Sequence, residues 1–150
     1  MIIKPADVRD AKEILDLQKL AYRSEAAIYD DYTIPPLIQT REEMEADFDD
    51  NLFLRASHEG KIIGSVRGRL SLGTCFIGRL IVHPAHQGRG LGTSLMNEIE
   101  KRFPKAERFE LFTGHRSEGN LRLYARLGYR PFKRERISTS LYFVYLQKLP

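Results

Sequence analysis

The segment RLIVHPAHQGRGLG, residues 79–92, constrains the fold of this chain more than any other. An apolar strand runs through His-Pro into a glycine-rich turn, and an apolar-periodic segment that must begin a helix follows over residues 93–102. Gln87, Gly90 and Gly92 match the pattern Q/R-x-x-G-x-G/A. Glycines at this spacing let successive backbone N–H groups point into one concavity, and the first turn of the helix adds its free donors and dipole. The segment therefore predicts a diphosphate site.

Two commoner phosphate loops do not fit. A P-loop requires G-x-x-x-x-G-K-[ST], which does not occur in the sequence. A dinucleotide fingerprint requires G-x-G-x-x-G, and a count from Gly88 places its last glycine on Thr93. A glycine-rich turn without a ligand is the remaining alternative at this point.

Length and composition favour one globular domain over residues 1–150, with 42% hydrophobic and 29% charged residues. The single cysteine, Cys75, cannot form an internal disulfide, which favours a reducing compartment. No apolar run approaches a membrane span, and the first residues acquire charge too early for a secretory signal. We therefore expect a cytoplasmic protein without a membrane partner.

The net charge of +4 is unevenly distributed. Residues 25–50 carry nine carboxylates and one base, whereas residues 101–136 carry eleven bases and four acids. A basic half beside an acidic half suits an anionic ligand that meets a cationic one, and suits a nucleic-acid surface less well. We expect no nucleic-acid partner, and scattered solvated charge is the alternative for either half.

Periodicity and turn signals predict an α+β (mixed α/β) order of elements. Asp7 and Thr40 are expected N-caps, the second within a capping box with Glu43, and a Tyr- and Asp-rich loop with Pro35-Pro36 separates the two helices. Strands are expected over 1–4, 52–58, 61–70, 74–82, 108–113, 130–137 and 140–148, and helices over 7–22, from 40, over 93–102 and over 119–127.

A second motif, NLRLYARLGY, occupies residues 120–129. Asn120 and Tyr124 are four residues apart and point the same way from one helix, so an amide and a phenol can act on one polar chain. A packed Tyr124 and a capping Asn120 would be the purely structural alternative.

Taken together, QGRGLG at 87–92 and NLRLYARLGY at 120–129 resemble the GNAT superfamily of N-acetyltransferases, and the resemblance covers nearly the whole chain. It implies a GNAT-like central mixed sheet of about seven strands flanked by about four helices. Strands 74–82 and 108–113 would be parallel and would splay apart to form a CoA cleft. It also implies an acyltransferase that moves the acetyl group of acetyl-CoA to a primary amine by direct attack.

The resemblance implies roles for individual residues. Tyr124 would act as general acid toward the CoA thiolate. Acetyl-CoA, as cosubstrate, would contact Leu80, Ile81, Val82, Gln87, Gly88, Arg89, Gly90, Leu91, Gly92, Thr93 and Asn120.

The general base is not assigned by the resemblance. Many relatives carry a glutamate on the central strand where this chain has Gly78. Glu110 on the next strand is a candidate, although strand alternation could equally turn it to solvent, and a water chain is the other candidate. His83 and His86 have the wrong spacing for a helical metal pair and lack a third ligand, so we expect no metal.

The resemblance implies an acceptor site framed by the loop between the first two helices and by the late strands. Its carboxylates and phenols would suit a cation, hence a small-molecule amine or a protein or peptide amine. The candidate residues are Tyr22, Glu25, Tyr29, Asp30, Asp31 and Tyr32. A mobile solvated loop is the alternative for this segment. A non-catalytic acyl-CoA sensor or interaction module is the alternative for the whole chain, and both a monomer and a homodimer are compatible with the sequence.

Overall fold

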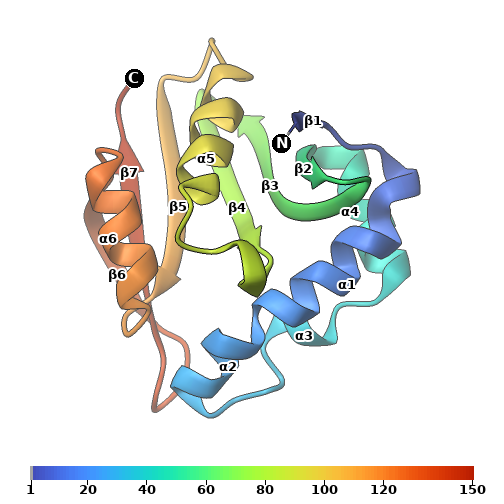
Figure 1. The fold of residues 1–150 in the computed structure, drawn as a ribbon. Helices are drawn as coiled ribbons and strands as arrows, with labels where there is room; N and C mark the ends of the chain where they lie inside the picture. Colours follow the sequence, from blue (N-terminus) through green and yellow to red (C-terminus); the bar gives the residue numbers. More distant parts are fainter. Residues whose placement is uncertain (1) are drawn as a thin grey trace.

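The computed structural model describes residues 2–150 and contains a seven-stranded sheet in the order β1-β2-β3-β4-β5-β7-β6 (Figure 1). Neighbouring strands in it are antiparallel except β4 and β5, which are parallel. The predicted mixed sheet is thereby confirmed. Its strands are β1 (Ile2–Pro5), β2 (Leu52–His58), β3 (Lys61–Ser71), β4 (Thr74–Val82), β5 (Arg108–Gly114), β6 (Arg130–Arg136) and β7 (Tyr142–Lys148).

Helices cover both faces of the sheet. They are α1 (Ala11–Ala21), α2 (Arg23–Tyr29), α3 (Pro35–Ile38), α4 (Arg41–Asp50), α5 (Leu91–Lys101) and α6 (Glu118–Arg126), with 3-10 turns at Val8–Asp10 and Pro84–His86. On one face α1 and α4 pack against Phe53, Ile62 and Ile81. On the other face α5 and α6 pack over a larger apolar cluster that includes Leu95 and Tyr124.

Local sequence signals fix where several helices begin and end. Thr40 and Glu43 form the expected capping box at the start of α4, and Asp7 forms one with Asp10 ahead of α1. Gly128 follows α6 in the left-handed region, with φ of 98°. The N-caps Asp7 and Thr40 were correctly predicted.

The segment between the two expected N-terminal helices is more ordered than predicted. Helix α2 continues almost directly from α1 through Tyr22, and α3 begins at Pro35, where the fixed φ of proline suits a first helical position. Helix α2 is seven residues long and buries only Ala26 and Tyr29. Such a short element carries too little apolar periodicity to be recognised in sequence.

Candidate active site: a cleft with two connected cavities

A cleft opens where β4 and β5 stop pairing. Only Thr74–Phe76 of β4 pair with Arg108–Glu110 of β5, after which the two strands diverge (Figure 1). A bulge in β4 lies just beyond this point, because the register with β3 shifts between Arg67↔Gly78 and Ser65↔Ile81. An extra residue on one strand bends and twists it. The splayed parallel pair that the resemblance implied is therefore present.

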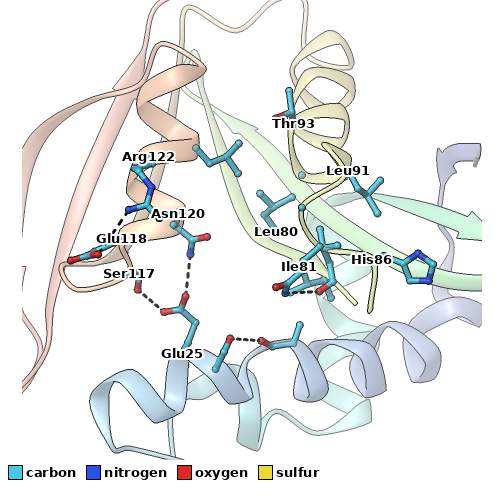
Figure 2. Close-up of a pocket in the computed structure, with 18 of the residues that line it drawn as sticks. Glu25, Leu80, Ile81, His86, Leu91, Thr93, Ser117, Glu118, Asn120 and Arg122 are labelled. Atoms are coloured by element: carbon cyan, nitrogen blue, oxygen red, sulfur yellow. Dashed lines mark hydrogen bonds and ion pairs between the residues drawn. The ribbon is translucent and has the colours of Figure 1, made fainter. Parts of the chain in front are cut away.

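The first cavity, of about 640 Å³, lies between the end of β4, the glycine turn and the start of α6. Figure 2 shows Leu80 and Ile81 on one side of it, with Ser117 and Asn120 on the other. All but one of the residues expected to contact acetyl-CoA line it; Arg89 does not. Its lining also includes Arg122 and Arg126 of α6, which the sequence did not single out.

The glycine turn presents backbone rather than side chains to this cavity. Gly88 and Gly90 have φ of 77° and 80°, a left-handed conformation in which a side chain is strained. A Cβ at either position would meet nothing within 4 Å, so the space in front of the turn is open. Gly90 is the N-cap of α5 and supplies no side-chain acceptor, so the first-turn N–H groups of the helix have no side-chain cap.

The outer half of β4 offers a free strand edge. The His83 N–H donates to the Ile63 carbonyl of β3 at 2.8 Å, whereas the Val82 carbonyl accepts from Gln87 Nε2 at 3.3 Å. Because backbone groups alternate sides along a strand, those of Leu80 and Val82 face the gap toward β5. An extended chain with amide groups, such as pantetheine, could pair with this edge.

Glu25 on α2 connects the N-terminal segment to α6. Ser117 Oγ donates to Glu25 Oε2, and Asn120 Nδ2 approaches Glu25 Oε1 at 3.4 Å and Thr113 Oγ1 at 3.3 Å (Figure 2). The Tyr29 hydroxyl is hydrogen-bonded to Ser117 Oγ at 2.9 Å. The amide of Asn120 is thereby oriented at the base of the cleft.

The second cavity, of about 510 Å³, continues from the first on the other side of this network. Both cavities are lined by Tyr22, Glu25, Leu80 and Asn120, so they share a wall. The second cavity is bounded by α2, α3, the bulged part of β4, β5 and the β6–β7 loop. Its apolar lining includes Ile34, Pro35, Pro36, Ile77, Leu111, Phe112, Ile137, Leu141 and Phe143.

Tyr124 is 6% exposed and lines the second cavity, beside Asn120 one helical turn earlier. Burial, followed by the nearby Tyr22 and Glu25, raises the pKa of its hydroxyl above the usual value. The hydroxyl therefore keeps its proton at neutral pH. A protonated phenol at this position could donate to an atom that acquires negative charge.

The structure distributes the other predicted site residues unevenly. Tyr29 and Asp31 line the second cavity, while Asp30 and Tyr32 line neither cavity. Glu110 lies at the paired end of β5, where Arg108 Nη1 contacts it at 2.9 Å, and it also lines neither cavity. The structure thus gives Glu110 no support as a base.

The two histidines of the H-x-x-H pattern lie at the end of β4 and in the turn that follows it. His83 follows the last residue of β4, and His86 lines the first cavity. Within residues 2–150 no group of three His, Cys, Asp or Glu side chains is arranged to hold a metal.

Two arginines that line the second cavity, Arg67 and Arg79, were not identified from the sequence. The sequence signal for Arg67 was a charged residue within an otherwise uncharged stretch of β3, and the neighbouring residues of that stretch are buried.

The comparisons with known proteins agree with this geometry. Residues 12–129 match the acetyltransferase (GNAT) family. The UPF0157 protein YqkA of Bacillus subtilis is 28% identical over 120 residues, which are 80% of this chain and 34% of that protein. The chain thus spans about a third of the length of this curated relative.

Two solved structures share the fold over nearly the whole chain. PaiA N-acetyltransferase of Thermoplasma acidophilum, in complex with coenzyme A, superposes with a TM-score of 0.83 at 19% identity and full coverage of both chains. The ribosomal-protein-S18-alanine N-acetyltransferase of Escherichia coli gives 0.82 at 15% identity, covering 99% of this chain and 92% of the other. No helix within residues 2–150 is long and apolar enough to cross a membrane.

Proposed function

This chain belongs to the acetyltransferase (GNAT) family, and on that premise we propose that it transfers the acetyl group of acetyl-CoA to a primary amine by direct attack. The observation that carries the proposal is the wall shared by the two cavities at Tyr22, Glu25, Leu80 and Asn120. An acyl donor in the first cavity and an amine in the second would meet there. Holding two reactants together at such a junction is itself a large source of rate acceleration.

The first cavity fits acetyl-CoA, which supplies an activated acyl group and a thiol leaving group. The uncapped first turn of α5 and the open backbone at Gly88 and Gly90 would hold the diphosphate. The free edge at Leu80 and Val82 would pair with the pantetheine amides. Arg122 and Arg126 add positive charge along the same cavity.

Side chains at the junction supply the proton chemistry. The buried Tyr124 hydroxyl would donate its proton to the departing sulfur. Glu25 would bind the incoming ammonium, because its carboxylate is the negative group in the shared wall. Glu25 already accepts hydrogen bonds from Ser117 and Asn120, so we assign it to binding the amine, which would lose a proton to solvent before its nitrogen attacks the thioester.

The proposal is tested by calorimetry and turnover with the purified chain. We expect acetyl-CoA to bind, dephospho-CoA to bind more weakly, and CoA thiol to be released in proportion to acetylated amine when amines are added. A suitable panel contains spermidine, glucosamine, L-lysine and L-phenylalanine. Binding without turnover on any amine would indicate the non-catalytic sensor instead, and no binding by folded protein would overturn both.

A further inference from the structure

Two arginines in the second cavity carry positive charge that the protein neutralises only in part. Arg67 of β3 is 8% exposed; its Nη1 donates to Asp47 Oδ2 at 2.6 Å, but its buried Nε has no hydrogen-bond partner. Arg79 Nη1 donates to the neutral Gln39 Oε1 at 3.1 Å. Within residues 2–150 no carboxylate lies within ion-pair distance of Arg79. Arg79 therefore carries a guanidinium charge in this cavity without a charged partner, and a second charge lies nearby on Arg67, so the pair is suited to an anion.

The backbone around these arginines leaves the space in front of them open. Gly78 lies directly across from Arg67 in the β3–β4 register, and a Cβ at Gly78 would meet nothing within 4 Å. Arg79 occupies the bulge of β4 with φ of 49°, a left-handed conformation that is unfavourable for a residue other than glycine. Strained residues of this kind persist mainly at functional sites.

The two guanidinium groups also disfavour one another. Burial, followed by the charge of Arg79, lowers the pKa of Arg67, whereas Asp47 opposes this shift. A carboxylate bound to Arg79 beside Arg67 would offset this repulsion. Arginine is well suited to this role because its planar donors match a carboxylate in two parallel hydrogen bonds.

The charges in the cavity are separated by position. The two arginines lie on β3 and β4, whereas the carboxylates come from the N-terminal segment: Glu25 on α2, in the wall shared with the first cavity, and Asp31 just after α2. Apolar side chains such as Ile34, Leu141 and Phe143 line the space around them. The cavity therefore complements a small molecule with an amine, a carboxylate and an apolar group.

We propose, on the basis of the function proposed above, that the acceptor is an amino carboxylate with an apolar side chain, such as leucine or phenylalanine. Its carboxylate binds Arg79 and is attracted by the nearby charge of Arg67, its amine faces Glu25 at the junction, and its side chain occupies the apolar part of the second cavity. A polyamine is disfavoured in the same cavity, because it would place further positive charge beside both arginines.

Matched acceptors test the substrate class. The kcat/KM for acetylation is measured for L-phenylalanine, L-phenylalaninamide and phenethylamine with saturating acetyl-CoA. We expect L-phenylalanine to exceed the amide by on the order of 10²-fold, since the amide leaves the guanidinium groups without a charged partner. The amine of the amide is the more weakly basic and more often neutral, so basicity alone would favour the amide. Equal values for acid and amide would overturn the inference.

Variants of Arg79 test the location. Arg79→Gln and Arg79→Gly should raise KM for L-phenylalanine by about 10- to 100-fold and abolish the preference over the amide. The glycine variant suits the left-handed backbone, so it removes the guanidinium without adding strain. Arg69→Gln, at an exposed position of the same strand as Arg67 and outside both cavities, is the matched control. Unchanged KM in both Arg79 variants would overturn the assignment.

Failure of this inference differs measurably from failure of the proposed function. If spermidine or glucosamine is acetylated and acceptors with a carboxylate are not preferred, the proposed acetyltransferase function is supported and the amino carboxylate acceptor is overturned. If no amine is acetylated, calorimetry with N-acetyl-L-phenylalanine still tests whether a carboxylate binds at Arg79. Binding to the wild type that weakens about tenfold or more in Arg79→Gly supports it; equal or undetectable binding to both overturns it.

Discussion

The two cavities are lined by different parts of the polypeptide. The first offers mainly backbone: the uncapped turn of α5, the left-handed glycines before it and the free edge of β4. The second offers side chains from segments far apart in sequence, including Arg67, Arg79 and Phe143. A site built from backbone groups depends on the positions of its glycines and tolerates most substitutions at the residues around it. A site built from side chains changes its binding properties with each substitution. In the proposed reaction, the donor cavity would therefore tolerate most substitutions around it, and the acceptor cavity would set the choice of substrate.

The largest effect is expected where the two cavities meet. Tyr124→Phe should lower kcat by on the order of 10²–10⁴, the usual contribution of a general acid, with the affinities for acetyl-CoA and acceptor unchanged. Steady-state kinetics together with calorimetry for each ligand measure this. The T-shaped contact with Tyr129 at 6.0 Å survives the change, so the variant should fold. Wild-type turnover would show that Tyr124 is structural.

A smaller effect, confined to the donor side, is expected for Gly90→Glu. The added carboxylate would stand in front of the uncapped helix turn and repel the diphosphate, raising the Kd for acetyl-CoA by about 10²-fold. Gly60→Glu is the matched control, because Gly60 is also left-handed, with φ of 78°, and has open space in front of it in the β2–β3 turn. If calorimetry gave equal Kd values for these two variants, the assignment of the diphosphate to the first turn of α5 would be overturned.

The smallest effect is expected at the edge of the acceptor side. Asp31→Asn should raise the KM for the amine about threefold without changing the Kd for acetyl-CoA, since the charge is partly exposed and is screened by solvent. Asp31 lines the second cavity and holds Thr33 through its Oδ1. Asp30→Asn is the control, because Asp30 lines neither cavity and asparagine suits its left-handed φ of 50°. Equal effects of the two changes on KM would mean that Asp31 acts only through the general charge of the loop.

The fold was largely predictable because its signals are local. N-capping residues act within a few residues of a helix start, and Asp7 and Thr40 were correctly identified as caps. Helix α2 was not predicted because its formation depends on tertiary contacts: the Tyr29 hydroxyl is hydrogen-bonded to Ser117 Oγ and to the Arg116 N–H. A Cβ at Gly114 would lie 2.0 Å from the Tyr29 hydroxyl, so the glycine at the end of β5 makes this contact possible.

The acceptor side could not be predicted in the same way. Arg79 reaches the second cavity through a bulge that is defined by the β3–β4 register, and no local pattern marks it. Glu110 was ambiguous for a related reason: alternation gives two faces, and only the structure shows its ion pair with Arg108. Side chains that converge from distant segments are specified by topology, which a short motif does not contain.

In the proposed reaction, the wall shared by the cavities would couple binding in one of them to binding in the other. A ligand that fixes Glu25 or Asn120 from the donor side also fixes it for the acceptor side, so the entropy lost in ordering that side chain is lost once rather than twice. By thermodynamic reciprocity, each ligand then changes the affinity for the other by the same factor. Glu25 is held by Ser117 and Asn120 before either ligand arrives, which limits how large that factor can become.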